Sequence, residues 1–171
     1  MTYAIVGLTH DLLFSRKLSE MKIAITTFSL LIVLAACTKG PKKYAEEVLQ
    51  IKLPSDSKVL LDFESHGGFN GDGETLIIFG LSHSGTMEMQ KELARKKWHT
   101  LPVSAEFENM AWLIHDSIDL SANSGYYHVI DNQSSNRPDA SFPIWERSSY
   151  NFTFSLLKQE ESKLYFYKLD T

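Results

Sequence analysis

The chain has 171 residues, of which 43% are hydrophobic and 22% are charged, and its formal net charge is −4. This length fits one folded domain, and an aromatic content of 12% excludes a disordered chain, because so much apolar surface would not stay solvated. The acidic balance argues against a nucleic-acid partner, which would need a positive field to meet phosphate. The single cysteine excludes an internal disulfide framework and a cluster of cysteine metal ligands.

The first forty residues have the pattern of an export signal. Met21 and Lys22 are followed by an uncharged run from Ile23 to Ala36, and then by Cys37. A membrane-spanning helix needs about 20 apolar residues, so this run is too short to span. A positive start, a short apolar segment and small residues before a cleavage point are typical of a secretory signal. We therefore expect residues 1–36 to be a signal region.

The end of this segment, Leu34-Ala35-Ala36-Cys37, resembles the lipobox of bacterial lipoproteins. The resemblance implies that the Cys37 thiol receives a diacylglyceryl group and becomes the first residue of the mature protein. The protein would then be anchored by lipid to the extracytoplasmic face of the cell membrane or outer membrane. Thr38 after the cysteine favours the outer membrane in a double-membraned host. The alternative is an uncleaved buried helix in which Cys37 is a small core residue.

Residues 1–20 allow two interpretations. Arg16 and Lys17 could extend a positive region that stays on the cytoplasmic side, or translation could begin at Met21. Both interpretations leave the same mature protein. We expect residues 37–43 to be a lipidated tether and residues 44–171 to be a single globular domain.

The sequence pattern of residues 44–171 predicts a small α+β domain. Apolar residues at helical spacing predict helices over 44–51, 84–98 and, after a Ser104 cap, 104–114. Period-two or continuous apolar runs predict strands over 58–64, 75–79, 126–130, 152–156 and 163–169, and a polar segment with two prolines predicts a loop over 131–143. We expect an antiparallel sheet of about five strands with two or three helices on one face.

The glycine-rich loop between the first two predicted strands is a candidate metal site. His66, Asn70, Asp72 and Glu74 offer a ring nitrogen and oxygens, and hard cations such as Ca²⁺ prefer several oxygen ligands. The spacing does not match the twelve-residue EF-hand loop. The alternative is an exposed hairpin connection that uses Gly, Asn and Asp for their turn conformations. No organic cofactor is expected.

Two short stretches are similar to motifs of esterases. His66-Gly67-Gly68 resembles an oxyanion motif, and the segment from Gly80 to Ser84 is one residue short of G-x-S-x-G, with Ser82 in the place of the nucleophile. Ser84 stands where that motif needs glycine, and the chain is too short for a complete α/β-hydrolase sheet. A serine that caps the following helix is the simpler interpretation, so we assign no catalytic residues.

Aromatic and histidine side chains outside this loop allow weaker hypotheses. The tryptophans could line a ligand groove or build the core, and three histidines lack metal-ligand spacing. These residues are Trp98, Trp112, Trp145, His99, His115 and His128.

The segments His66-Gly67-Gly68-Phe69 and Gly71-Asp72-Gly73-Glu74, together with the C-terminal 164–171, resemble small uncharacterised lipoproteins of Firmicute-type bacteria. The resemblance implies lipidation and a single domain, and it transfers no activity.

Two classes of function follow. The first is a membrane-anchored, non-catalytic surface lipoprotein that binds an envelope protein, the cell wall or a small ligand. The second is a small envelope hydrolase or metal-binding module centred on residues 66–74, which requires His66, Asp72 and Glu74 to face one cleft. The sequence does not decide the oligomeric state.

Overall fold

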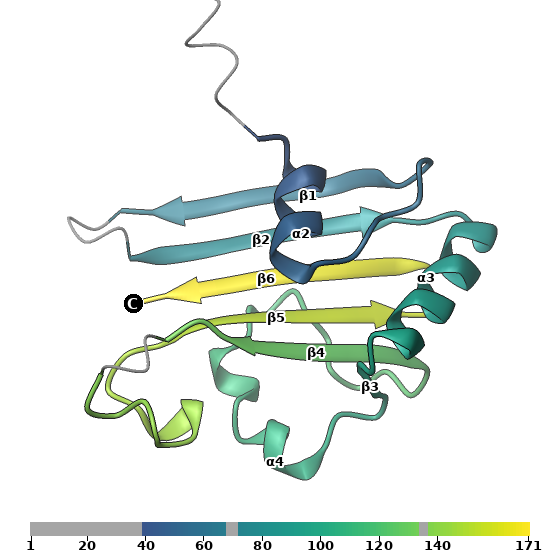
Figure 1. Cartoon of the computed structure of the whole chain (residues 1–171). Helices are drawn as coiled ribbons and strands as arrows, with labels where there is room; N and C mark the ends of the chain where they lie inside the picture. The colour runs from purple at the N-terminus through teal and green to yellow at the C-terminus, as the bar shows by residue number, and fades with distance from the viewer. Residues whose placement is uncertain (1–38, 68–71, 134–136) are drawn as a thin grey trace, which may run out of the picture. The chain divides into compact units, whose positions relative to one another are not determined.

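The computed structural model describes residues 39–67, 72–133 and 137–171. Within it, Pro41–Thr171 form a compact unit built on one antiparallel sheet of six strands, in the order β1-β2-β6-β5-β4-β3 (Figure 1). The strands are β1 (Lys58–His66), β2 (Gly73–Gly80), β3 (His99–Thr100), β4 (Gly125–Asp131), β5 (Asn151–Lys158) and β6 (Lys163–Asp170). The α+β class and the antiparallel sheet expected from the sequence are confirmed, with one short strand, β3, added.

The C-terminal hairpin forms the centre of the sheet. Strands β5 and β6 pair with Phe154 opposite Tyr167 and Leu156 opposite Tyr165. Successive side chains of a strand point to opposite faces, so alternation divides the core into two clusters, one on each face. We call the face of Ile77, Phe79, Leu157, Leu164 and Phe166 the helix face. The other is the pocket face, which carries Leu76, Tyr127, Phe152, Phe154, Leu156, Tyr165 and Tyr167.

Two helices cover the helix face, on the near side of the sheet in Figure 1. Helix α2 (Pro41–Leu49) buries Ala45 and Leu49, and helix α3 (His83–Arg95) buries Met89 and Leu93 in the same cluster. Ser82 caps α3 by accepting a hydrogen bond from the backbone N–H of Gly85 at 3.0 Å. Helix α2 begins three residues before the predicted start, so Pro41–Leu49 includes residues assigned by sequence to the tether. Lys42 Nζ donates to the carbonyl oxygen of Pro54 at 2.6 Å.

The pocket face is covered by a mostly irregular segment between β3 and β4. The helix predicted over 104–114 is reduced to one turn, α4 (Ala105–Glu108), followed by the 3₁₀ turn η1 (Ala111–Leu113). The buried residues Phe107, Met110 and Leu113 are three positions apart. In a 3₁₀ turn, where hydrogen bonds join residues i and i+3, side chains with this spacing lie on the same side of the turn. Met110 N–H accordingly bonds to the carbonyl of Phe107, and Leu113 N–H to that of Met110, each at 2.8 Å. The predicted Ser104 cap is confirmed, since Ser104 Oγ accepts from Phe107 N–H at 3.2 Å.

A second irregular segment, which follows β4, completes the cover of the pocket face. It contains the 3₁₀ turn η2 (Ile144–Glu146), and Ile144, Trp145 and Tyr150 pack against the cluster on this face. The described part of the predicted polar loop therefore leads into residues that pack on the sheet.

Strand β1 is the outer strand of the sheet beside β2. All nine of its residues are exposed, and the pairing with β2 is irregular between Val59 and Leu61. Among the described residues, no helix is both long and apolar enough to cross a membrane.

Candidate functional site

The structure separates the residues proposed from the sequence as metal ligands. Glu74 lies opposite Ser65 in the β1–β2 pair, whereas His66 lies opposite Gly73. Because cross-strand partners share a face and neighbours alternate, His66 and Glu74 point to opposite faces of the sheet. His66 Nε2 lies 3.2 Å from Thr75 Oγ1, and Glu74 Oε2 accepts from the hydroxyl of Tyr167 at 3.0 Å.

The two remaining residues that the sequence suggested as metal ligands do not form a metal site with described residues. Asp72 is exposed, and Asn70 lies outside the described residues. In the described part of the chain, no group of three or more His, Cys, Asp or Glu side chains could hold a metal ion. His66, Asp72 and Glu74 therefore do not face one cleft in the described structure.

Ser82 has a structural role in the described fold. Its Oγ accepts from Gly85 N–H and lies 3.0 Å from the hydroxyl oxygen of Ser84. These contacts are those of a helix cap, as the sequence favoured over a nucleophile. Gly68, which belongs to the esterase-like motif, and Cys37, the proposed lipidation site, both lie outside the described residues.

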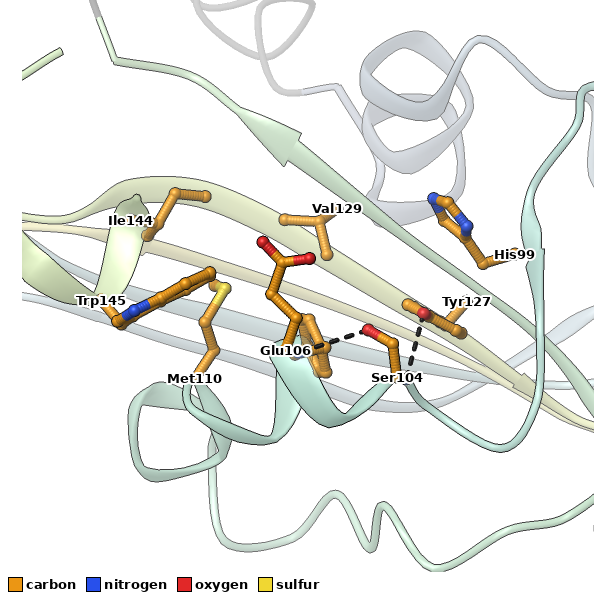
Figure 2. Close-up of a pocket in the computed structure, with 9 residues that line it drawn as sticks. His99, Ser104, Glu106, Met110, Tyr127, Val129, Ile144 and Trp145 are labelled. Atoms are coloured by element: carbon orange, nitrogen blue, oxygen red, sulfur yellow. Dashed lines mark hydrogen bonds between the residues drawn. The ribbon is translucent and has the colours of Figure 1, made fainter. Parts of the chain in front are cut away.

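A pocket on the pocket face brings together residues that the sequence did not group. It has a volume of about 380 Å³ and lies between α4, β4 and η2. Small-molecule sites usually occupy about 300–1,000 Å³ and combine apolar walls with a few polar groups. The pocket is lined by His99, Ser104, Glu106, Phe107, Met110, Tyr127, Val129, Ile144 and Trp145 (Figure 2).

Packing and hydrogen bonds hold the inner wall of the pocket in place. The ring of Phe107 lies 4.8 Å from that of Phe154 and 5.5 Å from that of Tyr127, centroid to centroid. The hydroxyl of Tyr127 accepts from the backbone N–H of Ser104 at 3.2 Å. Phe107, Met110 and Tyr127 are all buried. The inner wall is therefore a packed part of the core.

Glu106 is the one acidic residue of the lining. It lies in the first turn of α4, and Figure 2 shows its carboxylate reaching toward the strand that carries Val129, with Trp145 on one side and His99 on the other. The Glu106 side chain is exposed and forms no hydrogen bond or ion pair with any described residue. In the described part of the chain, neither a lysine nor an arginine lines the pocket. The carboxylate is therefore available to a ligand.

The outer wall, formed by Ile144 and Trp145, is held by a buried arginine. Arg147 follows η2 and is only 7% exposed. Its guanidinium donates to both carboxylate oxygens of Asp131 at the end of β4, and also to the carbonyl oxygens of Phe142 and Ala140. The hydrogen bonds from Arg147 lower the pKa of Asp131, and those to Asp131 raise the pKa of Arg147. The segment with Trp145 is thereby tied to the sheet.

The sequence left open whether the tryptophans line a ligand groove or build the core, and the three tryptophans differ in this respect. Trp98 is buried in the core of the helix face, Trp112 is 65% exposed, and Trp145 lines the pocket. Of the histidines, His99 lines the pocket and stacks on Tyr127 with ring centroids 5.1 Å apart. His128 stacks on Trp98, and its pKa is lowered by burial and by nearby His99.

Searches of protein-family models, of curated proteins and of solved structures found no match to this chain. The site therefore has to be interpreted from its own geometry. Sequence reasoning missed Glu106, Met110 as a pocket residue and the anchoring role of Arg147. The available signal was the apolar Ile144-Trp145 pair inside a polar region, which favours a segment that folds back onto the domain.

Proposed function

We propose that this protein is a lipid-anchored, non-catalytic binding module of the bacterial envelope, and that its pocket on the pocket face takes a small ligand. The lipobox-like Leu34-Ala35-Ala36-Cys37 supports the anchor. The observation that carries the binding function is the pocket itself, with a packed aromatic floor and a carboxylate that has no partner among the described residues. Apolar walls of this kind bind a ligand by removing its surface from water.

A neutral probe tests whether the pocket binds. We expect 4-phenylbutan-1-ol to bind the full chain and to shift the indole NMR signal of Trp145. Val129→Phe adds bulk to the pocket wall and should weaken this binding about tenfold or more, since overfilling a site displaces its ligand. Val59→Phe is the matched control, because Val59 is 43% exposed on β1 and outside the pocket. Equal binding to both variants would contradict the proposed site.

A partition experiment tests the anchor. Cys37→Ala removes the only thiol that could carry a diacylglyceryl group, so the protein should move from the detergent phase to the aqueous phase of a phase-separating detergent. Ser29→Ala, within the same apolar run, should leave the partition unchanged. Detergent-phase protein in the Cys37→Ala variant would count against lipidation.

A further inference from the structure

We propose that the pocket selects an organic cation, namely a small molecule with an ammonium group on an aromatic or aliphatic body. This inference rests on the proposed function, because it names the ligand class of the same pocket. It depends on one juxtaposition, the exposed carboxylate of Glu106, which has no partner among the described residues, beside the aromatic side chain of Trp145 (Figure 2).

The charge of the lining favours a cation. Among the nine described residues that line the pocket, Glu106 carries the only carboxylate, and none is a lysine or an arginine. The arginine closest to Trp145 along the chain is Arg147, and its guanidinium already forms an ion pair with Asp131. An ammonium group would therefore meet an acceptor with no lysine or arginine among the described lining residues to compete for it, although His99 also lines the pocket, whereas a carboxylate ligand would face repulsion from Glu106. The net charge of −4 adds a weak long-range attraction for cations.

The aromatic walls favour a cation attached to an apolar body. Aromatic rings attract ammonium groups through their quadrupole. Trp145, which is half-buried, is the side chain of the lining for this contact, because the ring of Tyr127 is buried against His99 and Phe107. Phe107, Met110, Ile144 and Val129 supply apolar contact for the rest of the ligand. A bare metal ion would gain nothing from these walls. The combination therefore selects an amine with a hydrophobic body over an inorganic cation.

Three probes of the same size separate charge from hydrophobic binding. They are 4-phenylbutylamine, 4-phenylbutan-1-ol and 4-phenylbutanoate, which at neutral pH carry a positive charge, no charge and a negative charge. We expect the amine to bind the full chain about tenfold more tightly than the alcohol, because charge-assisted hydrogen bonds are about twice as strong as neutral ones. The acid should bind more weakly than the alcohol. Raising the ionic strength should reduce the preference for the amine, since the open pocket is screened by salt.

A pair of glutamate variants assigns the preference to one side chain. Glu106→Gln should weaken binding of the amine about tenfold and leave binding of the alcohol within about twofold. Glu108→Gln is the matched control: it lies on the same turn, it is exposed, it is outside the pocket lining, and it changes the net charge equally. Because Glu106 has no partner in the described structure, neither variant should alter the thermal unfolding midpoint appreciably.

The outcomes separate the two proposals. If none of the three probes binds, the pocket is not a small-ligand site and the proposed function fails. If the alcohol binds as tightly as the amine, or the acid binds best, the pocket binds ligands but the cation inference is overturned. Equal losses of amine binding in Glu106→Gln and Glu108→Gln would also overturn it, because net charge alone would then explain the preference.

Discussion

Arg147 and Asp131 form a two-point ion pair, in which Nη1 and Nη2 donate to Oδ1 and Oδ2 at 2.8 Å each. The guanidinium is buried, whereas the carboxylate is 42% exposed at the end of β4. The planar fork of arginine matches a carboxylate at two points, and its remaining N–H groups reach the carbonyls of Phe142 and Ala140. One side chain thus fixes the path of the segment that carries Trp145.

Replacing this arginine with lysine should destabilise the fold. The single ammonium group of a lysine cannot reproduce the fork, so in Arg147→Lys we expect the free energy of unfolding to fall by about 2 kcal/mol, the scale of lost hydrogen bonds to charged groups. Urea unfolding measures this change. Arg137→Lys is the control, since Arg137 is 45% exposed and lies 3.8 Å from Asp139, and it should change stability by less than about 0.5 kcal/mol. Similar losses in both variants would contradict the anchoring role.

Lys158 forms a second ionic link, between the pocket-face segment and the central hairpin. Its buried Nζ lies 3.0 Å from Asp119 Oδ2 and 3.0 Å from Glu161 Oε1. Glu161 also accepts from Lys163 and from the hydroxyl of Tyr165, each at 2.9 Å. These hydrogen bonds, that from Lys163 above all, lower the pKa of Glu161 from 4.5 to about 2.

The lowered pKa of Glu161 predicts a dependence of stability on pH. A carboxyl whose pKa is lower in the folded state stabilises the fold above its unfolded pKa, and this contribution is lost as the pH falls through the folded pKa. Glu161→Gln should therefore be less stable than wild type at pH 7, by about 1 kcal/mol or less, because Glu161 is exposed and solvent screens its ion pairs. The difference should shrink between pH 4.5 and about 2. Urea unfolding at several pH values measures it.

Glu160→Gln is the control for this prediction, since Glu160 is exposed at the same turn. Its unfolding free energy should follow that of wild type throughout this range. A Glu161→Gln variant whose deficit stays constant from pH 7 to pH 2 would contradict the assigned contacts.

Local sequence patterns predict most of the elements because their causes are local. The alternation of Phe152, Phe154 and Leu156 requires a strand with one buried face, and Ser82 and Ser104 are capping residues placed before apolar runs. The prediction failed for the helix over 104–114 because Leu113 is buried together with Phe107, Met110 and Ile114, and the chain there forms i→i+3 hydrogen bonds. Packing against the sheet favours the 3₁₀ turn over the α-helix here, and a local sequence pattern does not show this packing.

The candidate site could not be predicted in the same way, because it depends on contacts between distant segments. In the sequence, nothing distinguishes Glu106 from other acidic residues in the first turn of a surface helix. Likewise, nothing distinguishes Arg147 from an exposed arginine. Only the strand order, which places β4 beside β5, brings His99, Glu106 and Trp145 around one pocket. In the same way, the closeness of His66 and Glu74 in sequence does not show that the two side chains point to opposite faces of the sheet.

The cap at Ser82 gives a prediction that distinguishes capping from catalysis. Ser82→Ala removes the acceptor for Gly85 N–H and should lower the free energy of unfolding by about 1 kcal/mol. Ser84→Ala is the control, because Ser84 is exposed and contacts only the Ser82 hydroxyl in the described hydrogen-bond set. We expect a fluorophosphonate, which labels activated serines, to leave wild type unmodified. Labelling that disappears in Ser82→Ala would restore the hydrolase hypothesis.

Gly125 gives the sharpest test of the β4–β5 pairing on which the pocket depends. Its φ is 138°, a region that side chains rarely adopt, and a Cβ there would overlap the carbonyl oxygen of Leu157 on β5. Gly125→Ala should therefore lower the free energy of unfolding by more than about 2 kcal/mol. In Gly80→Ala the atoms nearest to the new methyl would be Leu60 side-chain atoms at 3.0–3.3 Å. Leu60 is 55% exposed and can rotate away, so this control should cost less than about 1 kcal/mol. Equal costs in urea unfolding would mean that β4 does not approach β5 as closely at Gly125 as described.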